Sequence, residues 1–171
     1  MPLISYSDLF HRMFKNERYA QAKVAFLRAG QDREANLCDA FALREKARLM
    51  STTAGVARAQ AFLDVANTFF AYAQNAPPER DGERRVCYTA AAGCYSEARE
   101  LKKAGDSYLM VERYKEAASH YKEGGHVDQM MEVITQHENA FDGDLRDRFV
   151  TFARMHYFKV SFGGRIVSKY L

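Results

Sequence analysis

The clearest pattern of apolar positions is a repeat with a period of thirteen residues in the second half of the chain. It carries large residues onto large ones and small onto small, which is typical of a repeated structural unit. Three series follow it: Tyr95, Tyr108, Tyr121 and Ile134; Leu101, Tyr114 and Val127; and Ala91, Ala104, Ala117 and Met130. The interval fits a helix of about ten residues followed by a tight turn. The pattern therefore predicts a succession of short antiparallel helices.

Apolar spacing and turn residues set the expected bounds of these helices. The predicted segments are 83–95, 101–109, 114–123, 127–137 and 145–158. Gly124-Gly125 marks the clearest break, whereas the joints at Arg99-Glu100 and Glu112-Arg113 lack glycine. Asp142, Asp144 and Asp147 lie around a turn, where we expect them to cap the last helix. Gly163-Gly164 is expected to detach the tail 161–171, which would be a short capping segment.

The first half of the chain predicts longer helices. A short helix is expected over 7–14, with Ser7 as its N-cap, and a second over 19–29, which Gly30 ends. Asp32 is expected to cap a helix that runs to Met50. The segment 54–75 carries two adjacent apolar stripes, which indicates a helix covered on two sides. Pro77-Pro78 excludes a continuous helix and predicts an exposed loop over 76–82.

Two sets of sequence strings carry a resemblance to known helical repeats. Segments 17–30 and 112–125 share Glu-Arg-Tyr, then a small residue, an aromatic residue and a glycine at matching places. This order resembles tetratricopeptide (TPR)-like repeats with shortened helices. The strings 25–30, 42–48, 91–95 and 114–125, in that order, resemble the helical-repeat region of the TPR-and-ankyrin-repeat proteins of animals and their fungal UvrD/Rep-like helicase relatives. Similar strings also occur in coatomer, clathrin and intraflagellar-transport solenoids.

The resemblance implies a fold and a setting for the chain. The expected fold is all-α, a TPR-like α-solenoid of short antiparallel hairpins in a right-handed superhelical stack, with no sheet. We expect one helical-repeat domain over 1–171, in which sub-arrays 1–75 and 83–160 are joined by the Pro-Pro loop. In the similar family such a region accompanies a superfamily-1 helicase-like motor. Arg99-Glu100 departs from the pattern, because the family usually turns there with glycine.

The charge of the chain is weakly positive and sits in its first half. The formal net charge is +3, and residues 1–75 hold ten basic and seven acidic side chains. Arg44, Lys46 and Arg48 come closest to a basic face, although Glu45 interrupts them. A nucleic-acid binder usually presents a basic stripe or patch. The alternative interpretation is a solvated helix face, which charge runs commonly form.

The sequence gives no sign of catalysis, of a metal site or of a cofactor. It contains no G-x-x-x-x-G-K-[ST], no H-E-x-x-H and no G-x-S-x-G string, which are the signatures of phosphate loops, zinc proteases and serine hydrolases. We therefore expect no enzyme activity in this chain, although a larger parent could be a helicase-like ATPase. Cys38, Cys87 and Cys94 are too few and too irregular for a disulfide framework. They predict buried free thiols and an intracellular setting, cytoplasmic or nuclear.

These observations leave two functions open. The first is a non-catalytic scaffold that binds a protein, a peptide or a neighbouring domain of a larger protein. The second is a nucleic-acid-associated accessory domain of a superfamily-1 helicase-like protein. Tyr95, Tyr108 and Tyr121 bear on both, because they would be either packing spacers or the lining of a binding groove. No apolar run approaches the roughly 20 residues of a membrane span, so no membrane partner is expected.

Overall fold

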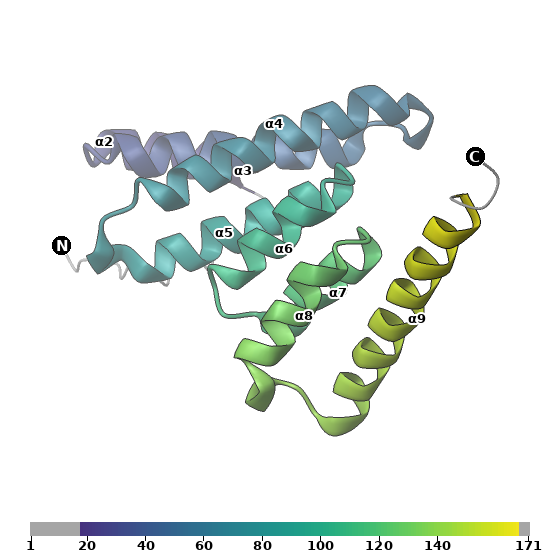
Figure 1. Ribbon diagram of the computed structural model, residues 1–171. Helices are drawn as coiled ribbons and strands as arrows, with labels where there is room; N and C mark the ends of the chain where they lie inside the picture. The colour runs from purple at the N-terminus through teal and green to yellow at the C-terminus, as the bar shows by residue number, and fades with distance from the viewer. Residues whose placement is uncertain (1–17, 168–171) are drawn as a thin grey trace. The chain divides into compact units, whose positions relative to one another are not determined.

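The computed structural model describes residues 18–167, with side chains over 18–159. The described part of the chain forms eight α-helices joined by short turns and contains no strand (Figure 1). The all-α class predicted from the periodicity is confirmed. The helix expected over 7–14, with its Ser7 cap, lies outside the described residues.

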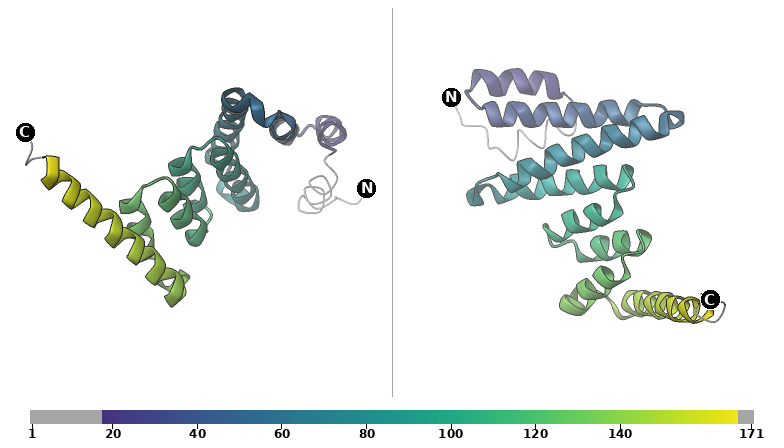
Figure 2. Two further views of the ribbon diagram at one scale, coloured as in Figure 1. Left: turned by 90° about the vertical axis from the view of Figure 1, so that its right-hand side faces the viewer. Right: turned by 45° about the horizontal axis from the view of Figure 1, so that its top comes forward.

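The chain forms two compact units, the first ending at Ala98 and the second beginning at Arg99. In the first unit, four helices lie side by side in chain order (Figure 2): α2 (Tyr19–Arg28), α3 (Asp32–Leu49), α4 (Gly55–Gln74) and α5 (Asp81–Glu97). The second unit holds α6 (Leu101–Leu109), α7 (Tyr114–Glu123), α8 (Val127–Gln136) and α9 (Gly143–Val167). Each helix packs on the next one within its unit.

The Pro77-Pro78 segment lies inside the first unit and does not separate two parts of the chain. Pro78–Arg80 forms a single 3-10 turn, and α4 and α5 pack along each other on either side of it. Arg80 pairs with Glu34 of α3, whose side chain is only 3% exposed. The expected joint between sub-arrays at this loop thus differs from the observed boundary after Ala98. The ionic contact between α3 and the turn joins residues that are far apart in sequence, so the Pro-Pro string alone does not predict it.

A second set of contacts holds the same corner together. Arg33 of α3 donates from Nη2 to the Tyr72 carbonyl oxygen at 2.8 Å and from Nη1 to the Asn75 carbonyl oxygen at 3.3 Å. Its Nε donates to Glu83 at 2.8 Å. The last carbonyls of a helix have no partner within the helix, so Arg33 caps α4 and ties it to the start of α5.

Both the helix starts and the turns between the helices of the second unit recur with the thirteen-residue period. Helices α6, α7 and α8 begin at Leu101, Tyr114 and Val127, as the period predicts. The residues at the joints take left-handed backbone angles: Arg99 (φ 62°), Glu112 (φ 61°) and Gly125 (φ 74°), as Gly30 (φ 69°) does in the first unit. Each follows an aromatic residue by four positions: Phe26, Tyr95, Tyr108 and Tyr121.

Backbone hydrogen bonds explain why the left-handed residue recurs. The amides of Gln31, Arg113 and His126 donate to the carbonyls of Phe26, Tyr108 and Tyr121 at 2.8–3.0 Å. This six-residue closure is the Schellman motif, in which the residue after the helix is left-handed and is usually glycine. Arg99 and Glu112 adopt the conformation without glycine. The joint at Glu112 therefore shares the hydrogen bond and the left-handed residue of the joint at Gly125, and the joint at Arg99 shares the left-handed residue.

Tyr121 is the centre of packing in the second unit. Its ring is 1% exposed and lies against Gly105 of α6, where an added Cβ would come within 2.6 Å of the ring. Its hydroxyl donates to Asp106 at 2.6 Å. The ring also belongs to the core that joins α7, α8 and α9, with Met130, Ile134 and Phe149. The absence of a side chain at Gly105 is thus required by the packing.

Two predicted helix starts have different outcomes. Asp142 accepts a hydrogen bond from the Leu145 amide at 2.9 Å, so the predicted capping role of this carboxylate is confirmed. Asp32 does not cap α3, because it is the first residue of the helix and Gln31 stands at the N-cap. An acidic residue in the first turn still interacts favourably with the helix dipole, which is why its position resembles a cap in the sequence.

The last helix is longer than predicted. The sequence predicts an end near Phe158 and a tail detached by Gly163-Gly164, but α9 continues to Val167. Glycine inside a helix costs only about 1 kcal/mol, so two glycines do not have to end one. The expected capping segment is part of α9 as far as Val167, and residues 168–171 lie outside the described residues. None of the helices in the described part has both the length and the apolar character needed to cross a membrane.

Candidate functional site

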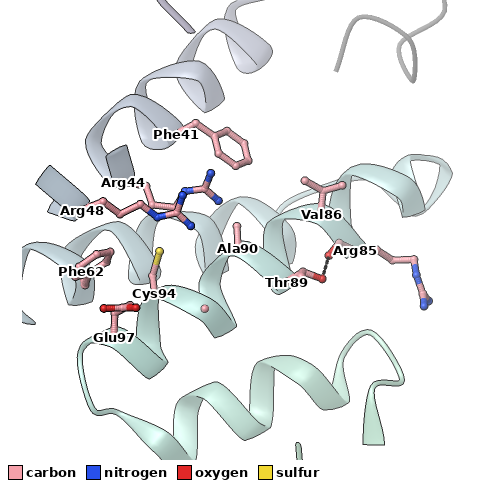
Figure 3. A pocket seen from close by; sticks show the side chains of 11 residues that line it. Phe41, Arg44, Arg48, Phe62, Arg85, Val86, Thr89, Ala90, Cys94 and Glu97 are labelled. Atoms are coloured by element: carbon pink, nitrogen blue, oxygen red, sulfur yellow. Dashed lines mark hydrogen bonds between the residues drawn. The ribbon is translucent and has the colours of Figure 1, made fainter. Parts of the chain in front are cut away.

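The first unit contains a cleft of about 500 Å³ that is lined by α3, α4 and α5 (Figure 3). Its lining combines arginines, small residues and two aromatic rings: Phe41, Arg44, Arg48, Phe62, Arg85, Val86, Thr89, Ala90, Gly93, Cys94 and Glu97. Phe41 and Phe62 are 2% and 0% exposed. The rings therefore form the back wall of the cleft, and the polar side chains and the small residues form its accessible surface.

Arg44 and Arg48 are one helical turn apart on α3, so both face the cleft. Figure 3 shows their guanidinium groups side by side above Cys94, whereas the Arg85 guanidinium points away from them. Glu45 accepts hydrogen bonds from Arg44 Nε at 3.1 Å and from Arg48 Nη1 at 3.0 Å. The Arg44 guanidinium also lies 4.9 Å from the centre of the Phe41 ring. The pair is thus held in place by one carboxylate and by packing on a buried ring.

The lower rim of the cleft carries a second ion pair. Glu97 of α5 accepts a hydrogen bond from Arg58 Nη2 at 3.0 Å, and the Arg58 guanidinium lies 4.8 Å from the centre of the Phe62 ring. The buried Arg58 Nε has no acceptor within the described part of the chain. With the two arginines of α3, three arginines face two glutamates around the cleft. The cleft therefore has an excess of positive charge.

The floor of the cleft is built from small or short side chains of α5. Ala90, Gly93 and Cys94 lie on the face of the helix that points into the cleft, with Val86 one turn earlier. A Cβ added at Gly93 would meet no atom of the described residues within 4 Å. Burial raises the pKa of the Cys94 thiol to about 11, so the group is neutral at pH 7. Since the thiolate is the reactive form of cysteine, Cys94 contributes a small neutral surface.

The basic residues singled out in the sequence do not all reach this site. Arg44 and Arg48 line the cleft, but Lys46 is exposed elsewhere on α3. Successive helix positions differ by about 100°, so a residue two positions from Arg44 points to the opposite side. The structure therefore splits the predicted basic face, and two of its three members join the cleft.

The three tyrosines of the thirteen-residue period occupy different environments. Tyr95 is 4% exposed and donates from its hydroxyl to Asn67 of α4 at 2.8 Å. Tyr121 is buried and donates to Asp106. Tyr108 is half-buried, with the Arg113 guanidinium 5.3 Å from its ring centre and the His120 ring 5.0 Å away. These contacts favour the interpretation as packing spacers over that of a groove lining.

Sequence reasoning missed the residues of α4 and α5 that complete the cleft. On α3, Phe41, Arg44 and Arg48 follow helical spacing, which is a local signal. On α5, Val86, Ala90, Gly93 and Glu97 also share one face. Nothing in the sequence indicates that these two faces meet, because the helices are separated along the chain by α4. The small residues on α5 were visible, but they also suit ordinary close packing of helices.

A second groove lies in the second unit, between α7 and α9. It measures about 450 Å³ and is lined in part by Lys122, Phe149 and Phe152. The Lys122 ammonium lies 5.7 Å and 5.1 Å from the centres of the two phenylalanine rings. This cation–π contact covers the apolar wall with a side chain of the protein itself. Part of the apolar wall of this groove is therefore already occupied by Lys122.

The described histidines make structural contacts. The His137 ring stacks on Tyr114 with centroids 3.7 Å apart, and His120 Nδ1 lies 2.8 Å from the Glu116 carbonyl oxygen. The described residues contain no group of three or more histidine, cysteine or acidic side chains arranged to hold a metal ion. Cys38, Cys87 and Cys94 are buried free thiols, as predicted. We find no match to this chain among protein-family models, curated proteins or solved structures.

Proposed function

We propose that this chain is a non-catalytic helical-repeat scaffold that binds a segment of another protein, or of a larger parent chain, in the cleft between α3, α4 and α5. The observation that carries the proposal is the cleft itself. It is an open space with an apolar back wall, two adjacent guanidinium groups and a helix floor without a side chain at Gly93. Sites for extended peptides combine apolar pockets with a few fixed polar groups.

The proposal includes the finer description of the fold. We infer that each unit is a short TPR-like stack of antiparallel hairpins, in the right-handed sense expected of such repeats. The Schellman joints support this, because the same tight turn with a left-handed residue recurs between successive helices. The resemblance to the TPR-and-ankyrin-repeat and UvrD-like helicase family belongs to the same proposal, as does an intracellular compartment. The three buried free thiols support the latter.

The alternative is a nucleic-acid-associated accessory domain, and one observation favours it. Arg44 and Arg48 lie side by side, as residues that bind a phosphate often do. Two further observations favour a protein partner. Phe41 and Phe62 are buried and have no face free for stacking on a base, and the small excess of positive charge at the rim suits a ligand with few charges better than a polyanion.

Selection of displayed peptides on the full chain tests the proposed function. A random peptide library is selected against the wild-type protein, and enriched peptides are measured by fluorescence anisotropy. Binding should slow amide exchange in α3 and α5, because these helices line the cleft. A Gly93→Leu variant, which places a side chain in the cleft, should lose the binding while keeping its fold. Failure to enrich any saturable peptide, or protection confined to α6–α9, would contradict the proposal.

A further inference from the structure

We propose that the cleft recognises an acidic peptide segment, with a ligand carboxylate held by Arg44 and Arg48 and a small apolar side chain seated over Gly93. This inference rests on the proposed function and adds the chemistry of the partner to it. Three features support it: the unused space at Gly93, the arrangement of the two guanidinium groups, and the role of Glu45.

The glycine at position 93 is not explained by the fold. Glycine in the middle of a helix destabilises it by roughly 0.5–1 kcal/mol relative to alanine. At Gly105 the cost is offset, because the Tyr121 ring occupies the space that a Cβ would fill. At Gly93 no atom in the part of the chain that the structure describes lies within 4 Å of an added Cβ, and the position opens into the cleft. The space is therefore open to a side chain from a partner.

The guanidinium pair is arranged for a carboxylate. Arg44 and Arg48 already bind one, because Glu45 accepts a hydrogen bond from each. The Arg48–Glu45 pair is solvent-accessible, because the Arg48 side chain is 55% exposed, whereas the Arg44 and Glu45 side chains are 16% and 20% exposed. Exposed ion pairs exchange partners at little cost. Glu45 thus acts as an internal competitor that holds the two arginines until a ligand carboxylate displaces it.

The charge of the rim favours a peptide over a polyanion. Arg44, Arg48 and Arg58 face two glutamates around the cleft, which leaves an excess of positive charge for a ligand carboxylate. A nucleic acid would bring a charge at every phosphate, which is more negative charge than the cleft can neutralise. An acidic segment with one or two carboxylates and a valine, alanine or leucine matches both the charge and the size of the open space.

Fluorescence anisotropy with two matched peptide families tests the inference. The probes are labelled peptides of about twelve residues that carry aspartate and glutamate around a central valine or leucine. The matched peptides carry asparagine and glutamine instead. Each probe is titrated with the full chain and with Arg48→Gln, Glu45→Gln, Gly93→Leu and Lys46→Gln. Lys46→Gln is the matched control, because it removes the same charge from the exposed side of the same helix.

The inference predicts a specific order of affinities. The acidic peptide should bind at least tenfold more tightly than its amide counterpart, since charge-assisted hydrogen bonds are about twice as strong as neutral ones. Arg48→Gln should weaken binding of the acidic peptide about tenfold, and Glu45→Gln should strengthen it severalfold. Gly93→Leu should abolish binding, and Lys46→Gln should leave it within a factor of two. Added salt should weaken the binding of the acidic peptide alone.

The other outcomes separate the inference from the proposed function. Equal binding of acidic and amide peptides that Gly93→Leu abolishes would overturn the inference and leave the scaffold function standing. Absence of saturable binding by both families, together with a failed library selection, would overturn both. A labelled single-stranded DNA that binds more tightly than the acidic peptide, and that is weakened equally by Arg48→Gln and Lys46→Gln, would overturn the inference in favour of a nucleic-acid surface.

Discussion

The two units use glycine inside a helix for opposite purposes. In the second unit the ring of Tyr121 occupies the space beside Gly105. Tyr121 belongs to the series of aromatic residues that recur every thirteen positions. In the first unit Gly93 faces an open cleft, and no repeat supplies a side chain to fill it. The regular unit thus uses its repeated spacing for packing, whereas the less regular unit leaves space at Gly93. The comparison indicates that the first unit, where the repeat is irregular, is the place to test the proposed binding of a partner.

The largest effect should come from removing the ring that fills the second unit. Tyr121→Ala deletes a ring that is 1% exposed and touches α6 as well as the core of α7–α9. We expect a loss of about 3–5 kcal/mol in the free energy of unfolding, seen by urea denaturation and by faster amide exchange over residues 101–136. The exposed Met110→Ala serves as the control. A loss below about 1 kcal/mol would show that the ring is not the centre of packing.

The equivalent test in the first unit removes the buried carboxylate of an ion pair. Glu34→Ala removes a buried carboxylate that pairs with Arg80 and leaves that arginine without this partner. We expect a loss of about 2 kcal/mol, because hydrogen bonds to charged groups contribute roughly this much, and faster amide exchange in α3 and α5. Glu79→Ala removes an exposed carboxylate from the same 3-10 turn and should be neutral. Equal effects of the two substitutions would contradict the role of Glu34.

The two glycines provide the sharpest test of the comparison, since the same substitution should have opposite signs. Gly105→Ala forces a Cβ to within 2.6 Å of the Tyr121 ring and should cost about 1–3 kcal/mol. Gly93→Ala meets no atom and should stabilise the first unit by about 0.5–1 kcal/mol through helix propensity. Thermal and urea denaturation of both variants measure the effects. If both destabilise the protein, the space at Gly93 serves its own fold.

The smallest effect should appear at the joints. Glu112 holds φ at 61°, a conformation that costs a side-chain-bearing residue roughly 1–2 kcal/mol. Glu112→Gly removes that cost but gives the unfolded chain more freedom, so we expect a gain of about 0.5 kcal/mol. Amide exchange of Arg113, which donates to the Tyr108 carbonyl at 3.0 Å, should slow by the corresponding factor. Faster exchange would show that the Glu112 side chain contributes to the joint.

Local periodicity was sufficient to predict most helices and failed where contacts are distant. The starts at Leu101, Tyr114 and Val127 follow from the period alone. The boundary after Ala98 could not be predicted, because the Glu34–Arg80 pair joins residues far apart in sequence. Only part of the candidate cleft could be predicted, for the same reason. Arg44 and Arg48 share a face of one helix, which is a local signal, but α5 lies next to them only in the folded unit. The predicted end of α9 near Phe158 was wrong, because Gly163-Gly164 does not end the helix.

The left-handed residues Arg99, Glu112 and Gly125 recur at the thirteen-residue period. The stretch 101–126 spans two of these periods, so it begins and ends at equivalent positions of the sequence repeat. Excising it would connect Glu100 to Val127 and preserve the aromatic residue, the left-handed residue and the helix start in their usual order. Repeat arrays depend mainly on contacts between neighbours, so we expect the chain to be shortened or lengthened in steps of two helices by protein engineering.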